Sequence, residues 1–293
     1  GVALVGYGQW TDVVTRSAEG DELYAFYGYK TDGVYTSFED LISSPVDMRS
    51  NSNPVVTNAD GTKSWSTNPG DYNPKTTTYI GDVKFVDVNG DGIIDENDKT
   101  KIGSAMPKWT FGWNNTFRYK NLDLTVFVNG SIGNKVGNYM KMKLTHMNSP
   151  WQNQLVDCGN HALLAPKNGQ AVDNWYYDAS NVIVTNPDCA YPRASINDPS
   201  DNDVWSDRFI EDGSYLRLKS ITLGYTFDKQ LIKKLGLTNL RLTLNATNLL
   251  TITGYDGYDP EIGASTASQN VYGLDNGRYP APTSFTFGLN VSF

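Results

Sequence analysis

Four stretches of this chain alternate apolar with polar residues, and this pattern constrains the fold more than any other feature. They cover residues 109–119, 122–128, 239–249 and 284–293. Successive side chains of a β-strand point to opposite faces, so each stretch predicts a strand with one apolar face and one small or polar face. Residues 214–227 alternate in the same way but change phase near Ser220, which predicts a β-bulge there. The sequence therefore predicts an all-β fold.

The connections between these segments differ greatly in length. The turn at Asn121 predicts a tight hairpin between the first two segments, and residues 229–235 predict a short helix that begins after Asp228 and ends at Gly236. We expect a second short helix over residues 37–42, capped by Ser37, and a third over residues 135–148. We expect further strands over residues 2–16, 23–30 and 81–86, and long loops near residues 43–78, 149–204 and 251–279.

Two architectures fit this pattern. In a water-soluble β-sandwich the apolar faces form the core and the polar faces meet water. In a transmembrane β-barrel the apolar faces meet lipid and the polar faces line the lumen. Strand segments of about ten residues, aromatic residues near the segment ends, and short connections that alternate with long ones favour the barrel. The alternation by itself does not decide between the two.

A second feature predicts a bound cation. Residues 87–98 read DVNGDGIIDEND, and oxygen-bearing groups fall at positions 1, 3, 5, 7, 9 and 12 of this twelve-residue loop. Calcium takes six to eight oxygen ligands at this spacing, with a glycine at position 6 for the turn. The candidate ligands are Asp87, Asn89, Asp91, the Ile93 carbonyl, Asp95 and Asp98. Position 12 is aspartate where glutamate would close the site with both oxygens, so a turn without an ion is the alternative.

Composition and motifs exclude several classes of function. The net charge is −8 and the sequence has no basic stripe, which argues against a nucleic-acid partner. We find no catalytic triad order, phosphate-binding glycine loop or metallohydrolase motif, so we do not expect an enzyme. Cys158 and Cys189 are the only cysteines, and both a disulfide and two free thiols are compatible with their spacing of 31 residues. His146 and His161 are isolated in the sequence, and we expect them to be structural.

Several blocks resemble a known family of membrane proteins. The segment at residues 209–227, FIEDGSYLRLKSITLGYTF, resembles a hallmark of the SusC/RagA-type TonB-dependent outer-membrane transporters of Bacteroidetes. Further matching blocks are YGYKTDG at 27–33, DVNGDGIID at 87–95 with Ile102 and Gly103, LTLNATNL at 242–249, GYDPE at 257–261, and residues 279–293. These blocks follow the order of the family over nearly all 293 residues, so the chain is identified with the C-terminal β-barrel portion of such a transporter.

The resemblance implies a fold and a function. It implies the C-terminal antiparallel strands of a 22-stranded transmembrane β-barrel with long extracellular loops, in the outer membrane of a Gram-negative, Bacteroidetes-like cell. It implies TonB-dependent import of an oligosaccharide, or alternatively a peptide, together with a SusD-like surface lipoprotein. We expect the signal peptide, TonB box, plug and earlier strands outside residues 1–293, so contact with the TonB complex would come from that N-terminal region. Phe293 resembles the terminal signal that the barrel-assembly machinery reads.

The resemblance also gives a context to the loops. Four aromatic residues in the long 149–204 loop, Trp151, Trp175, Tyr176 and Tyr177, are candidates to stack on a substrate sugar, with loop packing or contact with the lipoprotein as the alternative. The acidic loop then becomes a structural calcium clip, or an ordered turn, at the barrel rim. A secreted, calcium-stabilised β-sandwich that binds glycan is the alternative to a transporter.

Overall fold

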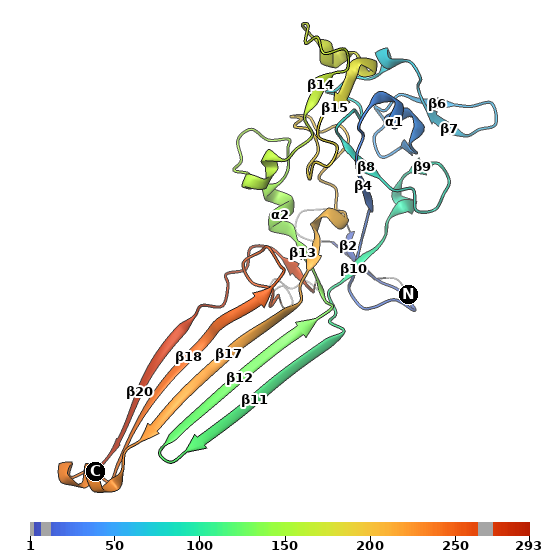
Figure 1. The fold of residues 1–293 in the computed structure, drawn as a ribbon. Helices are drawn as coiled ribbons and strands as arrows, with labels where there is room; N and C mark the ends of the chain where they lie inside the picture. Colours follow the sequence, from blue (N-terminus) through green and yellow to red (C-terminus); the bar gives the residue numbers. More distant parts are fainter. Residues whose placement is uncertain (1–2, 7–12, 263–271) are drawn as a thin grey trace. The chain divides into compact units, whose positions relative to one another are not determined.

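The computed structural model describes residues 3–6, 13–262 and 272–293, and β-strands dominate it (Figure 1). The chain divides into two compact units. Of the described residues, unit 1 comprises 3–6, 13–103 and 138–210, and unit 2 comprises 104–137, 211–262 and 272–293. No helix in the described part of the chain is long and apolar enough to span a membrane.

Unit 1 consists of short strands and single helical turns joined by irregular chain. Its first sheet has the order β1-β2-β3-β10, built from β1 (Ala3–Gly6), β2 (Val13–Ser17), β3 (Ala25–Gly28) and β10 (Thr100–Ser104). Four strand pairs complete it: β4 (Thr31–Val34) with β8 (Val83–Phe85), β5 (Val46–Asp47) with β9 (Ile93–Ile94), β6 (Val55–Thr57) with β7 (Lys63–Trp65), and β14 (Leu164–Pro166) with β15 (Val182–Val184). Its helices are α1 (Phe38–Ser43), α2 (Tyr139–Leu144), and the 3-10 turns η1 (Pro69–Asp71), η2 (Glu96–Asp98), η3 (Val156–Gly159), η4 (Trp175–Tyr177), η5 (Ala179–Asn181) and η6 (Asp207–Phe209).

Aromatic residues from distant segments form the core of unit 1. Tyr35, Phe38 and Leu41, from α1 and the chain before it, pack with Tyr79 and Val182 in one buried cluster. Helix α1 begins where the sequence predicts, because the Ser37 hydroxyl accepts a hydrogen bond from the Asp40 amide at 3.2 Å. The long loops expected from the sequence thus contribute to a packed body.

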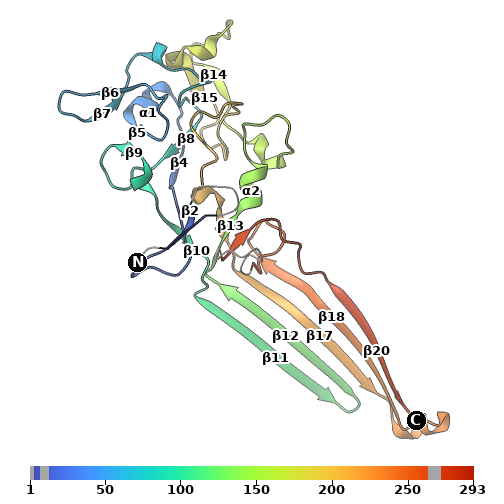
Figure 2. The same cartoon turned by 180° about the vertical axis from the view of Figure 1, so that it is seen from behind.

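Unit 2 contains one long antiparallel sheet with the order β11-β12-β17-β18-β20. Its strands are β11 (Trp109–Tyr119), β12 (Leu122–Ile132), β17 (Tyr215–Thr226), β18 (Asn239–Thr253) and β20 (Ser284–Ser292), and they lie side by side in both views (Figures 1 and 2). A second, three-stranded sheet has the order β16-β13-β19, from β16 (Ile210–Asp212), β13 (Lys135–Asn138) and β19 (Leu274–Asp275). The five alternating stretches of the sequence are therefore five neighbouring strands.

The connections of the long sheet agree with the sequence at two points. The hairpin predicted at Asn121 pairs Tyr119 with Leu122. Between β17 and β18, helix α3 (Lys229–Ile232) and the turn η7 (Lys233–Leu235) end at Gly236, which has a left-handed φ of 74°. A glycine takes up that conformation without the steric cost that a side chain brings.

The predicted bulge is confirmed. Leu218 pairs with Val128 and Ser220 pairs with Phe127, so Lys219 is the extra residue on β17. The bulge keeps the apolar residues of β17 on one face although their sequence phase changes, because Leu218 before it pairs with Val128 and Ile221 after it pairs with Val126.

The helix expected over residues 135–148 is wrong at its start. Lys135–Asn138 form β13, and α2 occupies only Tyr139–Leu144. The Asn138 side chain accepts a hydrogen bond from the Lys141 amide at 2.8 Å and caps the helix at that point. Part of the strand expected over residues 2–16 and part of the loop expected over residues 251–279 lie outside the described residues.

Candidate functional site

The acidic loop is closed by hydrogen bonds to its own backbone. The two carboxylate oxygens of Asp87 accept from the amides of Gly90, at 2.6 Å, and Gly92, at 2.7 Å. Both glycines have a positive φ, 79° and 85°, which turns their N–H groups inward at little steric cost. Asn89 and Asp91 each accept from the amide two residues further on. The glycine turn predicted within this loop is therefore present.

The second half of the loop is a capped helical turn. The carboxylate of Asp98 accepts from the amides of Val88, at 2.9 Å, and Asp95, at 2.7 Å, and so joins the two ends of the loop. Asp95 accepts in turn from the amide of Asn97 at 2.7 Å. Asp98 is fully buried, whereas Asp87 is half-buried and Asp91 is exposed.

The ion itself stays a prediction. In the described part of the chain, no group of three or more His, Cys, Asp or Glu residues is arranged to hold a metal ion. The oxygens that the sequence assigns to calcium already accept N–H groups, although a carboxylate oxygen has a second lone pair to offer a cation. The loop is thus an ordered turn by its own hydrogen bonds.

The loop is attached to the rest of unit 1 through β9. The amides of Val46 and Met48 donate to the carbonyls of Gly92, at 3.0 Å, and Ile94, at 2.9 Å, which makes β5 and β9 a parallel pair. Asp47 lies between Val46 and Met48 on this attached segment, and it is buried in the interior of unit 1.

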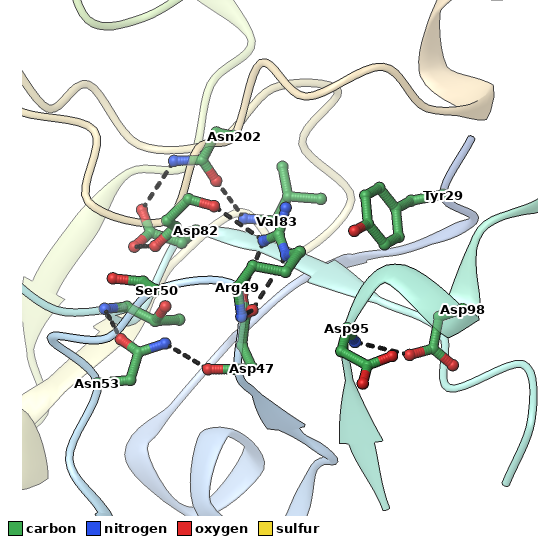
Figure 3. Close-up of polar contacts among 12 residues, drawn as sticks. Tyr29, Asp47, Arg49, Ser50, Asn53, Asp82, Val83, Asp95, Asp98 and Asn202 are labelled. Atoms are coloured by element: carbon green, nitrogen blue, oxygen red, sulfur yellow. Dashed lines mark hydrogen bonds and ion pairs between the residues drawn. The ribbon is translucent and has the colours of Figure 1, made fainter. Parts of the chain in front are cut away.

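Asp47, like Asp82, is a buried carboxylate of unit 1 that takes part in contacts between distant segments (Figure 3). It accepts two hydrogen bonds from Arg49, from Nε at 3.0 Å and from Nη2 at 2.7 Å. The Arg49 guanidinium also donates to the Ser200 carbonyl at 2.8 Å and lies 3.9 Å from the ring centroid of Phe85. A planar guanidinium satisfies a carboxylate, a carbonyl and a ring face together.

Asp82 is the second of these carboxylates, and none of its surface is exposed. Arg193 Nε lies 2.7 Å from its Oδ1, and the Ser200 hydroxyl donates to its Oδ2 at 2.5 Å. Asn202 donates its side-chain N–H to Asp82 at 3.2 Å and accepts the Val83 amide at 2.7 Å (Figure 3). A buried charge with this many partners fixes residues 193–202 against residues 79–83. Nothing in the sequence around Asp82 indicated this role.

A second acidic group in the same segment has a perturbed pKa. Burial raises the pKa of Asp203 to about 7, and the nearby charge of Asp198 adds to the effect, while His146 and Arg208 oppose it. Asn148 donates to Asp203 at 3.2 Å. The charge state of Asp203 therefore depends on pH near neutrality.

Three of the four candidate aromatic residues lie together. The rings of Tyr176 and Tyr177 are 4.5 Å apart, and Trp175 contacts Tyr176 edge-on at 6.2 Å. The Tyr176 carbonyl accepts from the buried Tyr79 hydroxyl at 2.6 Å, which fixes this turn to the core of unit 1. Trp151 is not part of this group of rings, and 92% of its surface is exposed. The contacts of these three rings fit packing within the loop at least as well as they fit stacking on a substrate sugar. A role in substrate binding stays a prediction.

The two histidines bond to neighbouring protein groups, and the two cysteines are not joined to each other. Cys158 and Cys189 are free thiols, and burial raises the pKa of each. His161 Nδ1 bonds to the Cys158 carbonyl at 3.0 Å, and the His146 ring bonds to Asn148 at 2.6 Å.

The sheet of unit 2 has two chemically different faces. Residues paired across neighbouring strands share a face, and most apolar residues of the five strands fall on one of them, whereas Phe127 and Tyr215 fall on the other. This face is exposed: 54% of Trp113, 76% of Phe285 and 65% of Phe287 are accessible. The sheet therefore presents a large apolar surface, which a water-soluble monomer rarely does.

The opposite face carries polar side chains that bond across the strands. Arg241 forms a bidentate ion pair with Asp123 at 2.7 Å and 2.8 Å. The Thr222 hydroxyl donates to Asn245 at 2.8 Å. This face thus has its own hydrogen-bond network.

A buried arginine fastens a loop to this polar face. Arg217 lies in the polar phase of β17 and is 3% exposed. It pairs with Asp259 at 2.5 Å and Glu261 at 2.7 Å, and it donates to Thr251 at 2.9 Å. The sequence predicts only a long loop near residues 251–279, because pairing over more than forty positions leaves no local signal.

Comparison with known proteins agrees with this architecture. The chain is 32% identical over 284 residues to TonB-dependent receptor P3 of Formosa agariphila, which covers 94% of this chain and 22% of the receptor. It is 27% identical over 213 residues to the TonB-dependent receptor SusC of Bacteroides thetaiotaomicron, covering 71% of this chain and 17% of SusC. No family model matches the chain.

A solved structure has the same fold. The RagAB peptide importer in its open-open state superposes with a TM-score of 0.56 at 18% identity, over 98% of this chain and 24% of the importer chain. These relatives are named as receptors and an importer, not as enzymes, in agreement with the expectation that the chain is not catalytic. The chain spans about a fifth of the length of the two receptors. The predicted resemblance is confirmed, and the chain is a relative of the SusC/RagA-type TonB-dependent receptors, matching a part of their length.

Proposed function

We propose that this chain forms part of the membrane-spanning wall and the outer loops of a TonB-dependent receptor that imports nutrients across the outer membrane. The exposed apolar face of the unit 2 sheet carries this proposal. An apolar sheet face is stable where lipid covers it, and a closed barrel satisfies every backbone hydrogen bond of the spanning strands.

The dimensions of the sheet support the proposal. Strand β11 has 11 residues, which at about 3.3 Å per residue gives ~36 Å, or ~25 Å of membrane depth at a tilt of about 45°. Trp109 and Tyr119 occupy its two ends and are 73% and 71% exposed. Aromatic side chains at both ends of an apolar strand are typical of the two interfaces of a membrane barrel.

The barrel would be completed by strands from the rest of the receptor. In the described sheet β11 and β20 each pair on one side, so each offers an edge for a further strand. A barrel of 22 strands, a SusD-like lipoprotein on the outer loops, energy supplied through TonB, and assembly through Phe293 follow from the resemblance to SusC and are proposed with it.

Only the chemical class of the substrate is proposed, an oligosaccharide or a peptide. RagAB is named a peptide importer, and the sequence resemblance favours an oligosaccharide with a peptide as the alternative. In the competing proposal, a secreted β-sandwich that binds glycan, a second sheet would cover the apolar face of unit 2.

Paired substitutions on β20 test the membrane assignment in the full-length receptor. Phe287 and Thr286 are neighbours on opposite faces. Arginine on a lipid-facing strand costs about 2–4 kcal/mol near the middle of the membrane, so we expect Phe287→Arg to reduce the amount of receptor with heat-modifiable gel mobility. Thr286→Arg should leave assembly intact, and nutrient uptake by the wild type should require TonB. Equal effects of the two substitutions, or a receptor soluble without detergent, would contradict the proposal.

A further inference from the structure

A cavity of about 940 Å³ lies over the polar face of unit 2, and the proposed function assigns it no ligand. Strands β11, β12 and β17 contribute Thr110, Asn129 and Tyr215 to its wall. The segments that connect β18 to β20 contribute Pro260, Tyr272 and Arg278. Its volume is in the upper range for sites that bind small organic molecules.

The two carboxylates of the cavity are already neutralised. Asp259 is held by Arg217, and its second oxygen accepts the Ala281 amide at 3.0 Å. One oxygen of Glu261, Oε2, pairs with both Arg217, at 2.7 Å, and Lys219, at 2.9 Å. Two cations and two carboxylates therefore balance each other at one side of the cavity.

Two further cations line the cavity without such a partner. Lys135 and Arg278 are exposed, and neither forms an ion pair within 4.0 Å with any residue in the described ranges. Lys135 also interacts with Asp212, which is not part of the cavity wall. The lining carries three cations and two carboxylates, an excess of one positive charge, and the buried Arg217 beside the wall adds a second, in a protein whose net charge is −8. Such a surplus attracts an anionic ligand.

The cavity also offers unused acceptors and flat rings. The side-chain oxygen of Asn129 is buried without a hydrogen-bond partner, which is unfavourable unless a ligand or water donates to it. The second oxygen of Glu261 has no hydrogen bond from a described residue. Tyr215 and Tyr272 add aromatic rings to the wall. Hydroxyl donors, a flat ring surface and a negative charge occur together in acidic sugars.

We propose that this cavity binds a carboxylate-bearing oligosaccharide, with Lys135 and Arg278 attracting its carboxylates and Asn129 and Glu261 accepting its hydroxyl groups. The inference rests on the proposed import function and specifies the charge of the cargo. A hydroxyl-rich ligand supplies more donors per unit length than a peptide backbone, which has one N–H per residue.

The test is binding by the full-length receptor in detergent, measured by titration calorimetry with three probes. These are trigalacturonate, maltotriose as a neutral sugar of equal length, and triglutamate as an acidic peptide. The variant Lys135→Gln/Arg278→Gln removes the surplus charge at exposed positions. The matched control Lys234→Gln removes an exposed charge in η7, which does not line the cavity.

We expect the wild type to bind trigalacturonate at least tenfold more tightly than maltotriose. The double variant should lose about tenfold in affinity for trigalacturonate, since a charge contact at about 5 Å in a partly screened site has this magnitude. Maltotriose binding and the Lys234→Gln variant should be unchanged.

Three results would overturn the inference: no binding of trigalacturonate, equal affinity of the wild type and the double variant, or tighter binding of triglutamate. The same preparation is first tested for heat-modifiable mobility. A correctly assembled receptor that fails to bind trigalacturonate refutes the cavity ligand alone, whereas a receptor that never inserts refutes the proposed function.

Discussion

A single glycine on β17 permits a side-chain ion pair between its two neighbouring strands, β12 and β18. The guanidinium of Arg241 on β18 reaches Asp123 on β12, and the strand between them contributes Gly224 at the crossing point. A Cβ atom on Gly224 would lie 2.2 Å from Arg241 Nη2 and 2.8 Å from Asp123 Oδ1. Gly224→Ala therefore cannot coexist with the observed ion pair, and Arg241 must move away.

The structure sets the size of the effect. The side chains of Arg241 and Asp123 are 34% and 21% exposed, so solvent weakens their attraction and the bidentate pair contributes about 1 kcal/mol. Alanine in a strand is otherwise about 0.5–1 kcal/mol more favourable than glycine. We expect Gly224→Ala to lower the free energy of unfolding by at most about 0.5 kcal/mol in the wild type, because the gain from alanine offsets most of the lost ion pair. In an Arg241→Gln background the same alanine should be neutral or stabilising, since the glutamine side chain is shorter.

The assay is urea unfolding of the full-length receptor in detergent, followed by tryptophan fluorescence, because Trp109 and Trp113 lie on β11 beside β12. Gly254→Ala is the matched control, since a Cβ at Gly254 meets no atom within 4 Å. The reasoning fails if Gly224→Ala costs the same with and without Arg241, because the two sites would then be independent.

Three further predictions concern unit 1 of the full-length receptor. Asp82→Asn leaves the buried Arg193 without a counter-charge and should cost about 3–5 kcal/mol in chemical unfolding, whereas Asp60→Asn at an exposed turn should cost little; equal costs would contradict the buried network. The pKa of Asp203 is raised to about 7 from an ordinary 3.8, so the folded protein holds this proton more tightly than the unfolded chain, and the resulting stability is lost as pH rises from about 4 to 7. Asp203→Asn should therefore reduce the dependence of the melting temperature on pH over that range. An unchanged slope would refute the assignment. Asp87→Ala removes the acceptor of two amides and should cost about 1–2 kcal/mol when calcium is absent. If the loop binds calcium, chelation lowers the melting temperature of the wild type and not of the variant; if chelation has no effect on either, the loop is only a turn.

The sequence predicts the parts of this fold whose cause is local. Alternation of side chains is a property of each strand, so all five strands of the long sheet and the bulge at Lys219 are readable from it. The caps at Ser37 and Gly236 are local as well, because each acts within one helical turn. The helix expected over residues 135–148 fails for the opposite reason: its first four residues pair with strands from distant segments, and this pairing overrides the local pattern.

The candidate sites divide in the same way. The hydrogen bonds that close the acidic loop on itself join residues at most ten positions apart, so its ordered turn is predictable while its ion is not. Arg217 pairs with Asp259 across 42 positions, and Arg193 pairs with Asp82 across 111. Such pairs depend on how the chain folds back on itself, and residue type alone does not specify the partner. The apolar face likewise has two interpretations in sequence, and its exposure in the structure favours lipid.

Accessibility measurements along β20 test the membrane assignment most directly. Single nitroxide labels at each residue from 284 to 292 would be placed in the full-length receptor, with Cys158 and Cys189 replaced by alanine, after reconstitution into lipid bilayers. Collisions with oxygen report lipid exposure, and collisions with a water-soluble nickel chelate report aqueous exposure. We expect labels at Phe285, Phe287 and Leu289 to favour oxygen and labels at Thr286 and Gly288 to favour nickel, in strict alternation. Apolar positions shielded from both reagents would indicate a covered core and would contradict a membrane-spanning wall.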